Sequence, residues 1–437
     1  MLAKWNCWDE SVTNKNAICL VTDRLHAGFL GAMGNSWVRT PSFDRLASES
    51  LLFDTAIIDS PCSEELYRGY WQGQHALESQ VSNRDSPDGS LPGRLASRSV
   101  RSVLLTDDPS IASLPMADLF SERVVVEVPE VAELASSIEE TALAQFFAAA
   151  IYAVEQLSEP SLVWLHTRGM NGPWDAPLEL REAFADEEDP NPRTSVDVPH
   201  IQLAADYDPD ELLPITQAYA AQVAVWDACL GMLVGALDES PVGERTLLNV
   251  VGLRGFPLGE HLTVGAESDA LYGELLHVPW VMRCPGGQAT SIRSHKIVQP
   301  PDLFATLCEW WAVDESVHAS ERPPFSDSLL KLSNTKEAWL RDRAASIGPG
   351  GQQSLWTSVW FWRRVVDENV GVGELVEELF AKPDDRFEVN EVTARCGDIC
   401  ELMAVAFDEI RQAASTPRDE PAEALGELDW RLTQRVV

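Results

Sequence analysis

Six side chains that could take part in binding or catalysis follow predicted strands or lie at predicted turns and helix starts. They are Asp23, Arg24, Cys62, Ser63, Arg254 and His261. In an open α/β sheet, side chains at the carboxyl ends of the strands face the crevice where ligands bind. A guanidinium binds an oxyanion through paired hydrogen bonds, and a histidine can act as a general acid or base near neutral pH. Residues of these types therefore suit anion binding or acid–base chemistry.

The elements that must position these groups are strands and helices in alternation. The apolar run 17–21 ends just before Asp23, and the run 246–251 ends just before Arg254. Further strands are predicted at 51–58, 99–106, 162–165 and 280–283. Helices are predicted from Thr40-Pro41 onward and at 136–157, 214–237 and 301–311. This alternation over residues 15–312 predicts an α/β domain with a largely parallel sheet.

Local signals refine the helix starts and the domain limits. Ser136 or Ser137 is expected to form a capping box at the start of its helix. The stretch 182–211 holds ten acidic residues and one arginine, which predicts a solvated loop. The polar, breaker-rich stretch 313–350 marks the domain boundary, with a main domain over 1–330 and a smaller C-terminal part over 350–437. The C-terminal part is expected to hold β-prone segments at 355–366 and 374–380 and a helix at about 392–413.

Composition limits the classes of partner. The net charge of −36 over 437 residues argues against nucleic acid and anionic membranes, because both need basic patches. No uninterrupted apolar run reaches the roughly eighteen residues of a membrane span. Residues 1–16 lack the apolar centre of a signal peptide, so the expected location is cytoplasmic. The eight cysteines show no disulfide framework or zinc spacing.

The order of motifs resembles the sulfatase family of the alkaline phosphatase superfamily. Gly34-Asn35, Thr40-Pro41 and the run from Asp44 to Ala47 are similar to the family's amino-terminal segment. Later segments resemble family segments in the same order, at 219–240, 277–286, 298–307 and 379–392. The resemblance implies a three-layer α/β/α sandwich with a mostly parallel sheet and a smaller C-terminal α+β subdomain.

The resemblance also implies a divalent cation, held by two ligands after the first strand and two after a later strand. Here those positions are Asp23-Arg24 and Leu253-Arg254, so Asp23 is the single oxygen ligand that remains. Two guanidinium groups stand where ligands are expected, and both repel a cation. We therefore expect no cofactor, and Ca²⁺ or Mg²⁺ only if the protein is an active hydrolase.

The family's nucleophile motif, Cys/Ser-x-Pro-x-Arg, is lost in either register. Cys62 or Ser63 could take the nucleophile position, and the Ser63 register keeps the spacing to Gly73. Neither register keeps the proline or the arginine, so modification of Cys62 to formylglycine is not expected. The simpler interpretation is a helix start with a hydroxyl cap. His261, in a Gly-Glu-His turn, is a further candidate acid or base, or a packing element.

Arg24 and Arg254 suggest a specific hypothesis if the fold brings them together. Their positive charge would replace the lost cation and pair with Asp23. The site would then be either a metal-free anion pocket or an internal salt-bridge cluster.

These observations predict a pseudoenzyme on the sulfatase fold, with a binding or assembly role. The partner would be another protein or a second copy of the chain. The alternative is a divergent sulfate- or phosphate-ester hydrolase that uses a rearranged site with Ser63 or His261.

Overall fold

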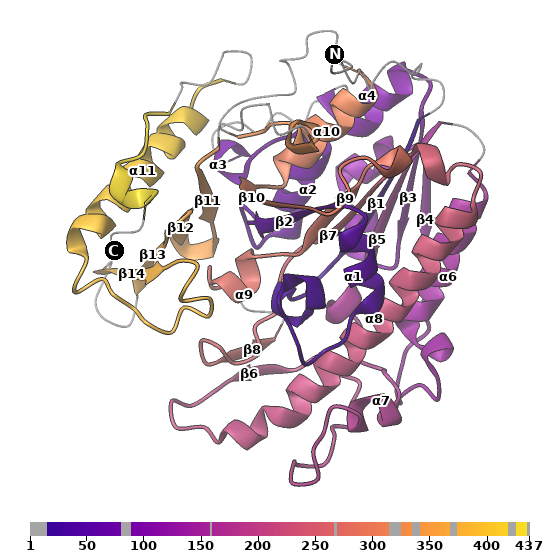
Figure 1. Ribbon diagram of the computed structural model, residues 1–437, viewed down its shortest axis with the longest axis horizontal. Helices are drawn as coiled ribbons and strands as arrows, with labels where there is room; N and C mark the ends of the chain where they lie inside the picture. Colours follow the sequence, from indigo (N-terminus) through magenta and orange to yellow (C-terminus); the bar gives the residue numbers. More distant parts are fainter. Residues whose placement is uncertain are drawn as a thin grey trace.

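The computed structural model describes residues 15–79, 89–157, 160–265, 269–313, 325–333, 341–367, 374–417 and 425–434. A large sheet with helices on both faces lies beside a smaller sheet that carries the last long helix (Figure 1). Arg322, Pro323 and Pro324 belong to the predicted boundary stretch and lie outside the described residues.

The large sheet consists of eight strands and is mostly parallel. Its strands are β1 (Asn16–Thr22), β2 (Leu51–Ala56), β3 (Arg101–Thr106), β4 (Glu122–Val125), β5 (Ser161–Thr167), β7 (Thr246–Gly252), β9 (Trp280–Arg283) and β10 (Ile292–Val298). Their spatial order is β10-β2-β9-β7-β1-β5-β3-β4, and β9 runs antiparallel to both of its neighbours. The α/β class with a largely parallel sheet is confirmed.

Side chains alternate between the two faces of the central strand β1, as the two-residue period of a strand requires. Ala17, Cys19 and Val21 pack on one face and Ile18 and Leu20 on the other. The first face is covered by α2 (Ser63–Gln72), α4 (Leu91–Ser97) and α10 (Pro301–Trp310). The second is covered by α1 (Pro41–Ser48), α6 (Ala142–Glu155) and α8 (Leu213–Glu239). The main domain is thus an α/β/α sandwich.

The C-terminal part is a four-stranded antiparallel sheet with one helix packed on it. The sheet has the order β11 (Arg343–Ile347), β12 (Gln353–Thr357), β13 (Trp360–Asp367) and β14 (Glu374–Ala381), and the helix is α11 (Gly397–Ala414). Trp362 of the sheet and Phe407 of α11 share one buried cluster with Leu77 and Phe325 of the main domain. The smaller α+β subdomain implied by the resemblance is present beside the main sheet (Figure 1).

The start of α6 differs from the sequence prediction. The helix begins at Ala142, and its N-cap is Thr141, whose hydroxyl accepts a hydrogen bond from the Ala144 N–H. The capping box expected at Ser136 or Ser137 is therefore wrong as the start of this helix. A tertiary contact decides the position, because the Asp175 carboxylate accepts a hydrogen bond from the Ala142 N–H.

The acidic stretch 182–211 is mostly exposed irregular chain, as predicted. It contributes one short strand, β6 (His200–Gln202), which pairs with β8 (Thr263–Gly265). The β-prone segment 355–366 divides into β12 and β13, and the last helix begins at Gly397 rather than near residue 392.

In the described part of the chain, α8 alone is long and apolar enough to cross a membrane by length and composition. Isolated polar residues interrupt its apolar run, so it is not one of the uninterrupted runs that the sequence analysis considered. Of its most apolar window, 67% is buried inside the protein. This burial is typical of a core helix.

Candidate functional site

Neighbouring strands bring Asp23 and Arg254 to the same edge of the sheet. In the parallel pair of β1 and β7, Thr22 is in register with Gly252. The Leu253 N–H continues this ladder by donating to the Thr22 carbonyl at 2.8 Å. Asp23 and Arg254 therefore leave adjacent strands at their carboxyl ends, which is the crevice that the sequence predicts.

The Asp23 carboxylate is 1% exposed and accepts hydrogen bonds on both oxygens. The Arg254 guanidinium donates from Nε to Oδ1 at 2.9 Å and from Nη2 to Oδ2 at 2.6 Å, which makes a bidentate pair. The Arg24 backbone N–H lies 3.0 Å from Oδ1, and Asn171 Nδ2 lies 3.3 Å from Oδ2. The Nη1 group of Arg254 donates to the Pro61 carbonyl at 3.0 Å. Arg254 thus links β1, β7 and the start of α2.

Charge in this pair follows from the contacts. Burial alone would raise the pKa of Asp23, but the charge and hydrogen bonds of Arg254, together with the charge of Arg24, bring it below its ordinary value. Burial alone would lower the pKa of Arg254, but Asp23 raises it. Both groups are therefore ionised at neutral pH, and the pair is a buried salt bridge.

Arg24 is the second guanidinium at this edge. Its φ of 60° lies in the left-handed region, which is uncommon for a residue with a side chain. The Tyr219 hydroxyl stabilises that turn by donating to the Arg24 carbonyl at 2.7 Å. The side chain is buried, and its Nη1 lies 3.4 Å from the Gly255 carbonyl. Burial and the charge of Arg254 lower the pKa of Arg24 to about 10. The Arg254 guanidinium thus pairs with Asp23, whereas Arg24 bonds to that carboxylate through its backbone N–H and acts on it through its charge.

Cys62 and Ser63 stand at the amino-terminal end of α2. Cys62 is the exposed N-cap residue, and its side chain makes no capping hydrogen bond; Ser63 is the first residue of the helix and is half-buried. The helix start is therefore confirmed, and the hydroxyl cap is wrong. The bond from Arg254 to the carbonyl of Pro61 places this end of the helix beside the Asp23 pair. In the described residues, no histidine is hydrogen-bonded to either side chain.

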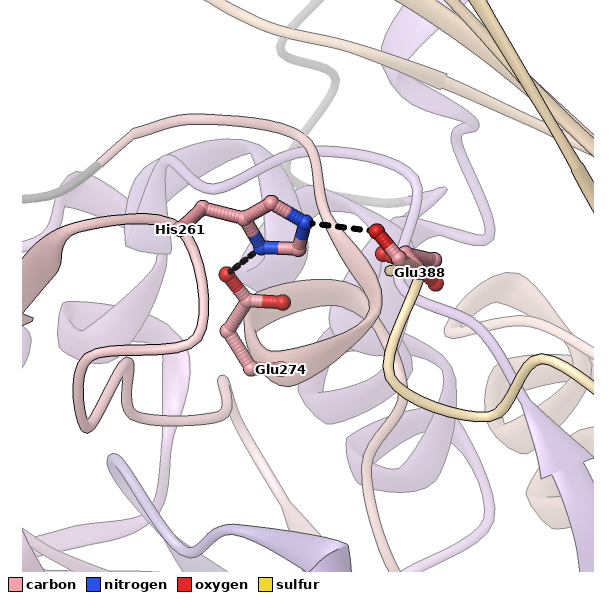
Figure 2. Close-up of side chains that lie close together, drawn as sticks. All are labelled: His261, Glu274 and Glu388. Atoms are coloured by element: carbon pink, nitrogen blue, oxygen red, sulfur yellow. Dashed lines mark hydrogen bonds and ion pairs between the residues drawn. The ribbon is translucent and has the colours of Figure 1, made fainter. Parts of the chain in front are cut away.

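His261 lies in a separate cluster where the main domain meets the C-terminal subdomain (Figure 2). Its Nδ1 is 2.8 Å from Glu274 Oε1, and its Nε2 is 3.2 Å from the backbone carbonyl of Glu388. Glu274 belongs to the short helix α9 (Gly273–Leu276), and Glu388 follows β14. The imidazole also stacks on Tyr272, with ring centroids 3.5 Å apart. None of the hydrogen bonds or ion pairs found in the described chain joins His261 to Asp23 or Ser63.

A buried polar chain beside Asp23 was missed by sequence reasoning. The Tyr67 hydroxyl is 2.6 Å from His166 Nδ1, and His166 Nε2 is 3.7 Å from the Asp108 carboxylate. Burial alone would raise the pKa of Asp108, but its hydrogen bonding and the charge of His166 lower it. The available signal was that Asp108 and His166 end neighbouring predicted strands. Tyr67 is 99 residues from His166, and no local pattern connects them.

The residues at Asp23 do not fit the divalent cation that the resemblance implies. Both carboxylate oxygens already accept N–H donors, and Arg254 brings a fixed positive charge to the face where a cation would bind. The cluster of His261, Glu274 and Glu388 has ligand atoms within 4.8 Å of one another. It does not fit an ion either, because the Lys382 ammonium lies 2.7 Å from Glu388 Oε1 and neutralises it.

Comparisons with known proteins agree with this architecture. The family model described as Sulfatase matches residues 15–313. The chain is 25% identical over 342 residues to iduronate 2-sulfatase of Homo sapiens, an alignment that covers 63% of this chain and 60% of that protein. The chain thus spans less than two thirds of this curated relative.

Two solved structures show the same fold along nearly the whole chain. The phosphonate monoester hydrolase of Agrobacterium radiobacter has a TM-score of 0.72 at 16% identity, covering 92% of this chain and 96% of the hydrolase. A 2-O GAG sulfatase has a TM-score of 0.67 at 15% identity, covering 94% of this chain and 95% of the other. At these identities, the structures support a shared fold and carry no further information about activity.

Proposed function

Because the chain belongs to the sulfatase family, we propose that it keeps the family's fold as a catalytically inactive protein with a binding or assembly role. The observation that supports this proposal is the bidentate salt bridge between Asp23 and Arg254. It uses both oxygens of the remaining ligand residue and places a guanidinium beside it. An internal ion pair thus occupies the position where the family resemblance implies a divalent cation.

The electrostatics of the crevice also favour this proposal. Asp107 and Asp108 follow β3 at the same sheet edge, and the chain as a whole has a net charge of −36, to which the stretch 182–211 contributes ten acidic residues. A sulfate or phosphate monoester approaching this molecule meets a negative potential. An enzyme for such substrates needs the opposite potential, because charge that develops in the transition state must be stabilised by cations or N–H donors.

Between the two arrangements open from the sequence, we propose the internal salt-bridge cluster over the anion pocket. Asp23 and Pro61 accept three of the five N–H donors of Arg254, and the carboxylate occupies the bidentate edge formed by Nε and Nη2, so most of this guanidinium's hydrogen-bonding capacity is used inside the protein. Sulfate is therefore expected to leave the melting temperature unchanged. A rise with sulfate in the wild type, lost in Arg254→Ala, would show that the anion pocket exists.

We expect the purified protein to bind neither Ca²⁺ nor Mg²⁺ and to cleave neither aryl sulfate nor aryl phosphate. Elemental analysis of the protein and its melting temperature with each cation measure the first expectation. Chromogenic release of the aryl alcohol measures the second. In the matched variant Arg254→Asn, the guanidinium is replaced by an amide oxygen donor, so any gain of a Ca²⁺-dependent melting shift reports cation binding at the vacated position.

Two outcomes would contradict this proposal. One is a stoichiometric divalent cation in the wild type, together with turnover that Asp23→Ala abolishes. The other is metal-independent turnover that Ser63→Ala or His261→Gln abolishes, which would establish the alternative of a hydrolase with a rearranged site. His261 is poorly placed for that role, because both of its ring nitrogens already face acceptors.

A further inference from the structure

The cluster around His261 ties the C-terminal subdomain to the main domain. The loop after β14 carries Glu388, whose backbone carbonyl faces His261 Nε2 at 3.2 Å. The carboxylate of the same residue accepts a hydrogen bond from the Gly273 N–H at 2.7 Å, at the start of α9. Glu388 thus contacts two segments of the main domain at once, the His261 turn and the start of α9. Figure 2 shows the first of these contacts.

The two partners of the imidazole are both acceptors. Glu274 Oε1 faces Nδ1, and the Glu388 carbonyl faces Nε2. A neutral imidazole carries one N–H, so one of these two contacts would set a lone pair against an oxygen. With Glu274 as a carboxylate, only the imidazolium donates to both, so the geometry favours the protonated form of His261.

Charges from each packed element agree with this assignment. Glu274 on α9 and Glu388 on the C-terminal loop supply two negative charges, and Lys382 neutralises Glu388 at 2.7 Å. This leaves Glu274 as the counter-ion of His261. Without the proton, Glu274 would be a carboxylate with a 7% exposed side chain and no positive partner among the described residues.

Neighbouring groups complete the surroundings of the ring. Tyr272 stacks on His261, and the Arg363 guanidinium of β13 lies 4.1 Å from the same tyrosine ring. Arg363 is paired in turn with Glu378 of β14. Glu260, adjacent in the chain, faces His26 at 3.4 Å.

We propose that His261 is a proton-dependent latch that holds the loop of residues 382–390, and with it the C-terminal subdomain, against the main domain. Protonated, the imidazole bridges Glu274 and the Glu388 carbonyl. Deprotonated, it loses one of these bonds and leaves the Glu274 charge uncompensated, so the loop separates more readily. The latch is independent of the proposed lack of catalysis.

The direction of the pH effect follows from the folded-state pKa. Burial alone would lower the pKa of His261, but the hydrogen bond and charge of Glu274 outweigh it and raise the pKa above its ordinary value. A group whose pKa is raised on folding stabilises the folded state, and this contribution is fully present at pH values below the pKa of the unfolded state, which is about 6.5 for histidine. That stability is lost as the pH rises through the folded pKa. The loop of residues 382–390 should therefore be held less tightly against the main domain at alkaline pH.

The first test is an NMR titration of the histidine ring protons in the full chain. His261 is expected to titrate above about 6.5, the ordinary pKa of a histidine side chain. Glu274→Gln removes the counter-charge and should bring the His261 titration down toward that value. A His261 that titrates at or below about 6.5 in the wild type would overturn the latch.

The second test is hydrogen exchange of residues 382–390 at about pH 6 and about pH 9, corrected for the intrinsic exchange rate. The protection of these amides in the wild type should fall roughly tenfold at the higher pH. His261→Gln should show, at both pH values, the low protection that the wild type shows at about pH 9, and the control His200→Gln, at an exposed histidine, should behave as the wild type. Protection in the wild type that does not change with pH would contradict the proposal, even if His261→Gln fails to fold.

Discussion

Arg254→Met is expected to lower the free energy of unfolding by about 3–5 kcal/mol, because it leaves the buried Asp23 carboxylate without its bidentate partner. Methionine keeps much of the side-chain bulk, so the loss reports charge pairing more than packing. Urea unfolding at neutral pH, followed by tryptophan fluorescence, measures it. The double variant Asp23→Asn/Arg254→Met should recover part of the loss, since it buries no unpaired charge.

The same pair predicts a dependence on pH. Asp23 has a lowered pKa in the folded chain, so its contribution is present above the unfolded value of about 3.9 and is lost as the pH falls through the folded value. Wild type and Arg254→Met should therefore converge in stability at acidic pH. The matched control is Arg45→Met, which breaks an ion pair with Glu49 on a side chain 62% exposed and should cost roughly 0–1 kcal/mol. If Arg254→Met costs no more than Arg45→Met, the pair is not a buried salt bridge.

This pairing could be predicted from sequence because it depends on sheet topology alone. Parallel strands end at a shared edge, so Asp23 after one apolar run and Arg254 after another were expected to meet if the two runs were neighbours. They are neighbours, as the register of Thr22 with Gly252 shows. The strand and helix alternation, the Thr40-Pro41 helix start and the family resemblance could be predicted for a different reason. Each depends on a local pattern that tertiary contacts did not override.

The rest of the site depends on side chains that are distant in sequence. His261 finds one partner 13 residues away and another 127 residues away, in the C-terminal loop. No periodicity or motif in either segment indicates the other. The proposed protonation of His261 depends on these two distant acceptors. The Gly-Glu-His turn by itself does not indicate it. The start of α6 shows the same limit, since Asp175 fixes it from 33 residues away.

A second buried ion pair lies at the boundary between the two parts of the chain. Asp302, in the first turn of α10, is fully buried, and Arg341 donates to it through both terminal guanidinium nitrogens. The carboxylate also accepts the N–H groups of Gln299 at 2.8 Å and Asp327 at 2.9 Å. Arg341 therefore holds the C-terminal end of the predicted boundary stretch against α10 of the main domain, just before β11 begins.

Asp302→Asn, and separately Arg341→Met, are each expected to cost about 3–5 kcal/mol of unfolding free energy, because each leaves a buried charge without its partner. The Arg341→Met loss should be accompanied by faster hydrogen exchange in β11, whose first residue lies two positions beyond Arg341. Equilibrium unfolding and exchange mass spectrometry measure the two effects.

The Asp302 pair and the His261 cluster are expected to differ in their response to pH. This difference allows their contributions to holding the C-terminal subdomain to be measured separately. The Asp302–Arg341 pair contains no histidine, and an arginine side chain keeps its charge between mildly acidic and mildly alkaline solution. Exchange in β11 should therefore not change over that range, whereas exchange in 382–390 should. Arg341→Met should loosen β11 at both pH values and leave the His261 titration in place. If β11 and 382–390 instead loosen together as the pH rises, the subdomain detaches as one unit and the Asp302 pair does not hold it independently.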